Sequence, residues 1–109
     1  LENGVSQIES NAGRFPQISG VSFIYNPKAK AGSRIISAKI GGQPLNKGRS
    51  YTVATNNYAA GGGDGYKVFK KGKVIIDASG ATLLASMVMD YIKAKGTVSP
   101  KVEGRIVAQ

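Results

Sequence analysis

The sequence predicts an α+β domain. Residues 21–25 place Val21, Phe23 and Tyr25 on one face as a strand does, and residues 34–40 are a second predicted strand, whereas residues 81–95 repeat apolar side chains at helical spacing. Strand and helix segments do not follow the regular spacing that a parallel βαβ sheet requires. The 109 residues suffice for one domain or part of one, and a hydrophobic fraction of 41% favours a folded chain.

The N-terminal segment carries a helical pattern. Leu1, Val5 and Ile8 are spaced by four and three residues, which places them on one helical face. Residues 1–8 are therefore expected to be the end of a helix that starts before the given sequence. The Asn-Ala-Gly run at residues 11–13 is expected to end it.

A hairpin is predicted after the first strand. The strand at residues 34–40 is followed by Gly41 and Gly42, the residue type that a primed two-residue turn favours. The chain then returns through residues 43–45. Pro44 places this return at an edge of the sheet, because proline cannot donate a ladder hydrogen bond.

The second half of the chain predicts two further strands and the main helix. The strands are expected at residues 51–55 and 102–107. The helix is expected over residues 81–95, with Ser79 as N-cap and Gly96 just past its end. Its apolar stripe consists of Leu84, Met87, Val88, Tyr91 and Ile92.

Composition excludes several kinds of site. The chain has no His and no Cys, so zinc, haem and iron–sulfur sites of the common kinds are excluded, as is Ser-His-Asp or Cys-His catalysis. The six carboxylates are scattered, and we expect no metal or cofactor in this chain. Taken alone, the chain is a poor candidate for an enzyme. No apolar run approaches the roughly 20 residues of a membrane span.

The charge balance indicates the class of partner. Fifteen basic and six acidic residues give a net charge of +9, which favours a nucleotide, a nucleic acid or a membrane surface, or simply makes a basic domain. The densest cluster contains Lys67, Lys70, Lys71 and Lys73. It is either a solvated face or a source of attraction for phosphates within about 8–10 Å at physiological salt.

The glycine-rich stretch at residues 56–66 is the candidate site. It matches neither a Walker loop, a dinucleotide-binding loop nor an EF-hand. Asp64 stands between two glycines, and Tyr58 and Tyr66 lie on either side. A carboxylate accepts hydrogen bonds from ribose hydroxyls, and an aromatic ring stacks on a base. The alternative is a tight turn whose tyrosine rings belong to the core.

Residues 57–66, with the sequence NYAAGGGDGY, resemble the signature of the 5′-nucleotidase C-terminal domain. The resemblance extends to residues 13–20, to Pro44-Leu45 followed by the YTVAT run at residues 51–55, and to residues 102–106. It therefore covers almost the whole chain and implies that domain's fold, a mixed sheet with packed helices.

The resemblance implies roles for individual residues. Tyr58 corresponds to a base-stacking aromatic residue, Asp64 to the residue that hydrogen-bonds the ribose, and Asn57 to a supporting position. The residues implied to shape the turn that aims the carboxylate are Gly62, Gly63 and Gly65.

The resemblance also implies a longer parent. Members of the family carry an N-terminal metallophosphoesterase domain with two divalent metal ions, and an earlier half of the C-terminal domain. Residues 1–109 would be the second part of that C-terminal domain, inactive alone, within a phosphohydrolase that is periplasmic, cell-surface or secreted. The expected partners are a nucleoside or nucleotide and the missing N-terminal portion, or a second copy of the chain.

Two questions stay open at this stage. The parent's substrate could be a 5′-nucleotide, a UDP-sugar, a cyclic nucleotide or NAD. The alternative function is a basic module that binds single-stranded nucleic acid through its charge and tyrosines, although the basic residues are spread along the chain and no nucleic-acid motif occurs.

Overall fold

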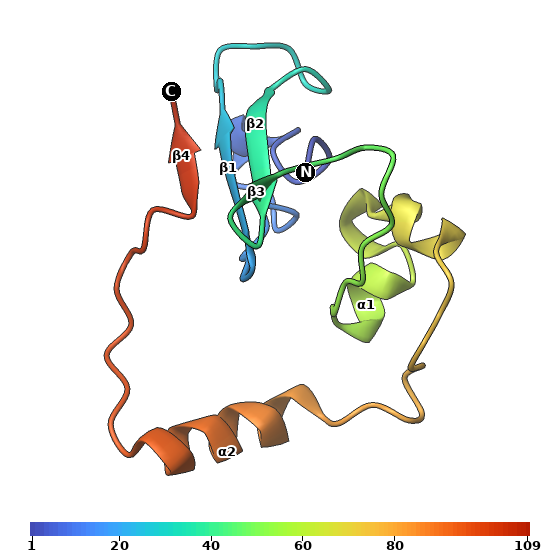
Figure 1. Ribbon diagram of the computed structural model, residues 1–109, viewed down its shortest axis with the longest axis vertical. Coiled ribbons are helices and arrows are strands. Elements are labelled where there is room, and N and C mark those ends of the chain that lie inside the picture. Colours follow the sequence, from blue (N-terminus) through green and yellow to red (C-terminus); the bar gives the residue numbers. More distant parts are fainter. The chain divides into compact units, whose positions relative to one another are not determined.

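The strands and the long helix belong to two separate units of the structure. The computed structural model describes residues 1–109 and divides them into a first unit, residues 1–53 with 102–109, and a second unit, residues 54–101. All strands lie in the first unit, and the long helix lies in the second (Figure 1). The predicted α+β class is confirmed.

The first unit is built on a four-stranded mixed sheet in the order β3-β2-β1-β4. Its strands are β1 (Val21–Tyr25), β2 (Ile35–Ile40), β3 (Gln43–Pro44) and β4 (Ile106–Ala108). Strand β1 pairs antiparallel with β2 and parallel with β4, which comes from the other end of the chain (Figure 1). The predicted strand at residues 34–40 thus begins one residue later than expected.

The hairpin between β2 and β3 has the predicted geometry. Gly41 and Gly42 have φ angles of +56° and +81°, as a type I′ turn requires at both central residues. Ile40 pairs with Gln43 across the turn, and β3 lies at the edge of the sheet. The position inferred from Pro44 is therefore confirmed.

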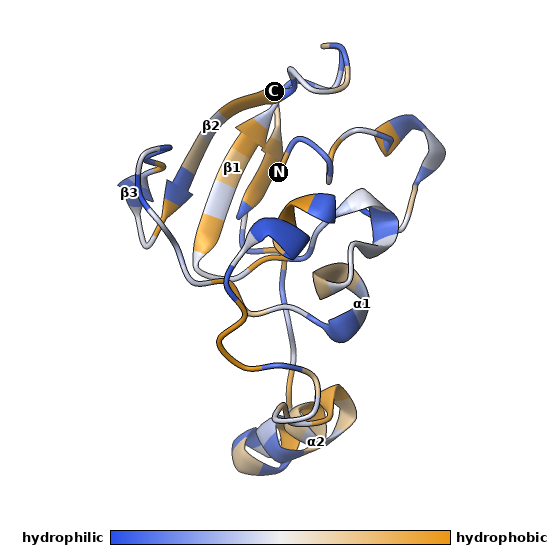
Figure 2. Ribbon diagram, turned by 90° about the vertical axis from the view of Figure 1, so that its right-hand side faces the viewer, coloured by the Kyte–Doolittle hydropathy of each residue, from blue (hydrophilic) through white to orange (hydrophobic).

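The core of this unit is small and lies along β1. Val5 is 0% exposed and Phe23 is 2% exposed. The Tyr25 ring lies 6.1 Å from that of Phe23 and 6.2 Å from that of Phe15, between centroids. Figure 2 shows β1 as mostly hydrophobic. Apolar burial alone is thus modest, and polar contacts complete the unit.

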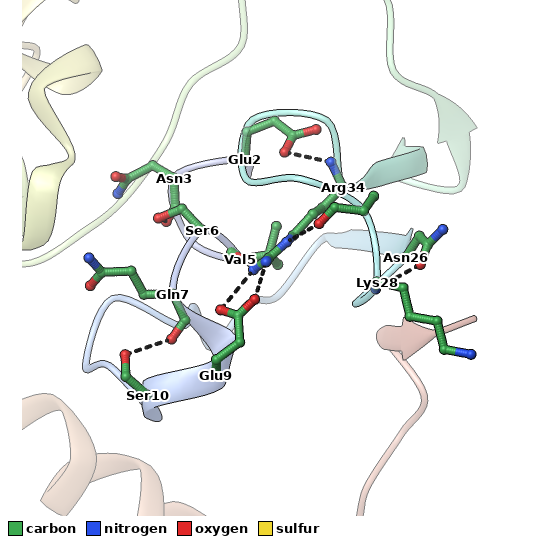
Figure 3. A network of polar contacts seen from close by, with 11 residues as sticks. Glu2, Asn3, Val5, Ser6, Gln7, Glu9, Ser10, Asn26, Lys28 and Arg34 are labelled. Carbon is green, nitrogen blue, oxygen red and sulfur yellow. Dashed lines mark hydrogen bonds and ion pairs between the residues drawn. The ribbon is translucent and has the colours of Figure 1, made fainter.

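Those polar contacts centre on the buried side chain of Arg34 (Figure 3). Its Nη1 donates to the carbonyl of Val5 at 2.6 Å, and its Nε donates to the carbonyl of Ala29 at 2.9 Å. The guanidinium also forms an ion pair with Glu9. That hydrogen-bonded guanidinium lowers the pKa of the Glu9 carboxyl.

A second carboxylate ties the N-terminal segment to the start of β2. Glu2 accepts hydrogen bonds from the backbone N–H groups of Arg34 at 3.0 Å and Ile35 at 2.8 Å. These contacts join residues more than thirty positions apart. The N-terminal segment is therefore held by side chains as well as by its own backbone.

The predicted helix over residues 1–8 is wrong. Residues 2–7 form hydrogen-bonded turns, followed by the short 3₁₀ helix η1 (Ile8–Ser10). The carbonyl of Val5, which an α-helix would pair within itself, instead accepts from Arg34. The expected end of the segment is confirmed, since Asn11 adopts the left-handed conformation with φ +50°.

The second unit contains four helical elements. These are α1 (Asn57–Ala60), η2 (Gly63–Gly65), η3 (Lys67–Lys71) and α2 (Leu84–Lys95). Helix α1 contacts η2 and η3. The glycine-rich stretch is therefore folded back on itself as a compact set of short turns.

Two predicted strands differ from the structure. Residues 51–55 form no strand, because a strand needs a neighbour for its backbone groups and none of the four strands pairs with them. Tyr51 instead contributes its side chain: its hydroxyl oxygen accepts from the backbone N–H of Asn46 at 3.0 Å. The last strand begins at Ile106, not at residue 102, after Gly104 with φ +69°.

Helix α2 ends as predicted but begins later. Its C-cap, Gly96, has φ +77° and donates to the carbonyl of Ile92 at 2.8 Å. Ser79 is not its N-cap: the helix starts at Leu84, and the Ser79 hydroxyl donates to Asp77 at 2.7 Å. The hydroxyl and the nearby backbone N–H groups lower the pKa of the Asp77 carboxyl, which stabilises a separate turn before the helix.

No residue of α2 is buried. Its apolar stripe is exposed by 62% at Leu84, 54% at Met87, 49% at Val88, 59% at Tyr91 and 40% at Ile92. A stripe of this kind ordinarily faces a core. None of the helices in the structure combines the length and hydrophobicity needed to cross a membrane.

Candidate functional site

The site begins at the N-terminus of α1. Asn56 is the N-cap, with extended backbone, and its side-chain oxygen accepts from the N–H of Ala59 at 2.8 Å. Asn57 is the first helical residue and is exposed; its carbonyl accepts from the N–H of Gly61 at 3.0 Å. Sequence reasoning missed Asn56, although an Asn directly before a helix is the residue that an N-cap favours.

The chain reverses sharply after α1. The N–H of Gly62 donates to the carbonyl of Ala59 at 2.9 Å, and Gly62 itself has φ +92°. Asp64 also takes a left-handed conformation, with φ +50°. Only Gly adopts such a backbone freely, and Asp and Asn are among the few other residues that tolerate it. The backbone of this turn therefore suits a glycine at position 62 and an aspartate at position 64.

The ring of Tyr58 lies directly against Gly63. A Cβ atom added to Gly63 would lie 2.5 Å from Cε1 of Tyr58, a distance that real side chains do not allow. The missing side chain at Gly63 is thus what lets the ring lie flat on the loop. Tyr58 is nevertheless 61% exposed, so most of its ring surface faces solvent.

The same loop brings Tyr58 and Asp64 together. The Tyr58 hydroxyl donates to Oδ1 of Asp64 at 3.3 Å, and Asp64 is half-buried. An exposed aromatic ring and a carboxylate therefore stand side by side on one small turn. Tyr58 and Asp64 are the two residues for which the family resemblance implies contacts with a base and a ribose.

The other residues of the stretch are arranged differently. The half-buried Tyr66 ring stacks on Phe69, with centroids 5.5 Å apart and planes 10° apart. Tyr66 is therefore occupied in packing, whereas Tyr58 is exposed. The stem of Lys70 lies over Gly62, since its Cδ would be 3.2 Å from an added Cβ.

The basic cluster next to this loop is exposed along its length. It comprises Lys67, Lys70, Lys71 and Lys73. Four exposed ammonium groups within seven residues create a local positive potential beside the Asp64 turn. Both earlier interpretations, a solvated face and an attraction for phosphates, are compatible with that exposure.

The residues present do not fit a metal centre. No three His, Cys, Asp or Glu side chains come together anywhere in the chain. Two surface hollows occur in the first unit, and neither includes Tyr58 or Asp64. One is lined by Ile8, Asn11, Ala12, Phe15 and Tyr25, and the other by residues of the β2–β3 hairpin with Asn46, Arg49 and Tyr51.

Comparison with known proteins decides the family. Residues 1–71 match the family described as "5'-nucleotidase, C-terminal domain". The chain belongs to the 5′-nucleotidase family. Membership confirms the predicted resemblance on a match that includes the whole Tyr58–Asp64 turn.

Relatives extend the match beyond residue 71. The chain is 37% identical to the trifunctional nucleotide phosphoesterase protein YfkN of Bacillus subtilis (strain 168), over 97% of this chain. It is 33% identical to a 5′-nucleotidase of Diplobatis ommata, over 98% of this chain. The chain spans only 8% and 20% of the lengths of these two proteins.

A solved structure shows the same fold. The crystal structure of a 5′-nucleotidase precursor from Thermus thermophilus superposes with a TM-score of 0.90 at 39% identity, covering 99% of this chain and 22% of that one. The 5′-nucleotidase-like fold predicted for the chain is thereby confirmed. The roles of Asn57, Tyr58 and Asp64 in binding stay predictions.

Proposed function

We propose that this chain is the nucleoside-binding part of a 5′-nucleotidase-type phosphohydrolase. The observation that carries the proposal is the hydrogen bond between the Tyr58 hydroxyl and the Asp64 carboxylate. Gly63, which has no side chain, leaves space in this turn for the Tyr58 ring. One ligand that needs both groups is a nucleoside, whose base stacks on a ring and whose ribose donates hydrogen bonds.

The ring of Tyr58 supplies the stacking surface. Gly63 backs the ring, and the 61% exposure leaves room for a planar base. Stacked aromatic pairs contribute about 0.5–1.5 kcal/mol beyond the area they bury. A ring held against the backbone loses little freedom when a base arrives, which favours binding.

Asp64 supplies the acceptors for the ribose. An ionised carboxylate accepts hydrogen bonds only, at roughly four lone-pair positions, and so suits two neighbouring hydroxyl groups. Asn57 supports this arrangement from the first turn of α1, where its carbonyl holds Gly61. Gly62, Gly63 and Gly65 keep the turn in the shape that presents the carboxylate.

Hydrolysis itself belongs to the remainder of the protein. The chain brings no three His, Cys, Asp or Glu side chains together, and the proposed two divalent ions would lie in an N-terminal metallophosphoesterase domain. This part would hold the nucleoside so that its phosphate stays near the reacting groups, which lowers the entropic barrier. The chain alone would release no phosphate, and the whole protein would act in the periplasm, at the cell surface or outside the cell.

The macromolecular partner is the rest of the same polypeptide. The apolar stripe of α2 is exposed within this chain, and the relatives are several times longer than the chain. Packing of that stripe against the preceding part of the protein would bury it. A second copy of the chain is the alternative occupant, which mass measurement in solution distinguishes.

Binding to the full-length protein tests the function. Titration calorimetry with adenosine compares the wild type with Asp64→Asn, because Asn tolerates the left-handed backbone that Ala does not. We expect about tenfold weaker binding, or roughly 1.4 kcal/mol, from the loss of a charged acceptor. Asp90→Asn in exposed α2 is the matched control. Equal affinity of the wild type and Asp64→Asn would remove the ribose role.

The nucleic-acid alternative rests on the lysine cluster beside the loop. Seven of the fifteen basic residues lie in residues 54–101, which leaves eight in the first unit (15 − 7 = 8), so the charge is not gathered on one unit. Binding of a single-stranded oligonucleotide that weakens steeply with salt would support this alternative. The absence of such salt-dependent binding would dismiss the nucleic-acid alternative.

A further inference from the structure

The hydroxyl of Tyr58 is the one part of that side chain which stacking does not use. It donates to Oδ1 of Asp64 at 3.3 Å, across six residues of chain. A phenylalanine ring would present the same face to a base without this bond. The hydroxyl therefore connects the two groups that the proposed function assigns to different parts of the ligand.

We propose that the Tyr58 hydroxyl is a positioning group that sets the Asp64 carboxylate for the ribose. This inference rests on the proposed function. Tyr58 thus serves the ligand twice, through its ring toward the base and through Asp64 toward the sugar.

The geometry gives the hydroxyl a fixed place. Gly63 lies against the ring, so sideways movement of the ring toward the loop is blocked. The left-handed backbone of Asp64, with φ +50°, fixes the direction in which its side chain leaves the chain. The hydrogen bond then restrains the remaining rotation of the carboxylate about its own side-chain bonds.

A carboxylate has roughly four lone-pair positions, and the Tyr58 hydroxyl donates to one of its two oxygens, Oδ1. A carboxylate already held in place loses less freedom when the ribose binds, and this preorganisation raises affinity. The benefit depends on the sugar hydroxyls, because they are the groups that reach Asp64.

The test compares two ligands on the full-length protein. Tyr58→Phe keeps the stacking face and removes only the hydroxyl. We expect it to weaken binding of adenosine by about threefold to tenfold, the range for a single hydrogen bond, and binding of 2′,3′-dideoxyadenosine by less than about twofold. Tyr91→Phe removes a hydroxyl from α2, outside the Tyr58–Asp64 turn, and is the matched control that should change neither.

A double-mutant cycle separates positioning from packing. In the Asp64→Asn background, Tyr58→Phe should cause a much smaller loss, because the positioned carboxylate is already gone. Equal losses for the two ligands, or equal losses with and without Asp64, would overturn the positioning role. The positioning role would also be overturned if Tyr58→Phe left adenosine binding unchanged while Asp64→Asn weakened it. That result would leave the proposed function intact. No effect of Asp64→Asn would instead remove the ribose role of Asp64 within the proposed function, on which the positioning role rests.

Discussion

The ring of Tyr58 lies so close to the backbone of Gly63 that it fills the space a side chain at position 63 would need. An added Cβ would stand 2.5 Å from Cε1 and 2.6 Å from two further ring atoms of Tyr58. Gly63 has no left-handed φ, so its glycine is required by this close approach and not by backbone conformation. The ring and the turn are therefore fitted to one another.

Gly63→Ala should displace the Tyr58 ring without unfolding the chain. The ring is 61% exposed and can rotate outward. The added Cβ at position 63 should therefore move the ring without greatly lowering the stability of the fold. We expect adenosine to bind the full-length protein about tenfold more weakly, roughly 1.4 kcal/mol, because stacking and the bond to Asp64 are lost together. The near-ultraviolet circular dichroism should change while the far-ultraviolet spectrum stays the same.

Gly72→Ala provides the control for this prediction. Gly72 has φ −79°, and an added Cβ would meet only the carbonyl of Phe69 at an ordinary 3.5 Å. The same chemical change outside the turn should leave adenosine binding unaltered. If Gly63→Ala bound adenosine as tightly as Gly72→Ala, the contact with the ring would have no bearing on the ligand.

Removal of the Arg34 side chain should loosen the first unit. Arg34→Met leaves the carbonyls of Val5 and Ala29 without their donors in a site where Arg34 was 4% exposed. Unsatisfied buried groups cost about 1–3 kcal/mol. We expect amide exchange in β1 and β2, followed by mass spectrometry, to accelerate by about tenfold or more.

The control for Arg34→Met is Arg49→Met. Arg49 is exposed and lies over the ring of Tyr51 at 5.6 Å, a contact worth far less than buried hydrogen bonds. Exchange in β1 and β2 should stay at the wild-type rate. Comparable acceleration in both variants would contradict the structural role of Arg34.

Acid should weaken the first unit through Glu9. The Arg34 guanidinium lowers the pKa of the Glu9 carboxyl in the folded state, so Glu9 stabilises the fold above its unfolded pKa. That contribution is lost as the pH falls through the lowered pKa. We expect Glu9→Gln to reduce the urea midpoint near neutral pH and to flatten its fall between about pH 5 and pH 3. Glu103→Gln, in an exposed pair with Arg105 at 3.4 Å, is the control and should keep the wild-type profile.

The sequence predicted best the features that neighbouring residues determine. Alternation alone located β1 with its observed bounds, and two glycines located the β2–β3 turn. The pairing of Tyr58 with Asp64 was also accessible, because a motif only seven residues long contains both. Their binding roles came from family resemblance and stay predictions.

Features that depend on distant partners could not be predicted. Residues 51–55 have a strand-forming composition, yet no strand of the chain pairs with them. Nothing in the residues next to Arg34 indicates that its side chain is buried. Only the folded chain brings it to the carbonyl of Val5, twenty-nine positions away. Asn56 and Asn57 are chemically identical, so the sequence could not tell which of them caps α1.

The apolar stripe of α2 should distinguish the chain alone from the full-length protein. Met87 lies on the stripe and is 54% exposed, whereas Met89 lies on the opposite side of the helix and is 53% exposed. If the rest of the protein covers the stripe, Met87→Lys should lower the melting temperature of the full-length protein by several degrees, since burying a charge is costly. Met89→Lys, the same change at equal exposure, should leave it unchanged. In the chain alone, both variants should melt like the wild type and α2 amides should exchange fast. Equal effects of the two substitutions in the full-length protein would mean that the stripe is not covered there.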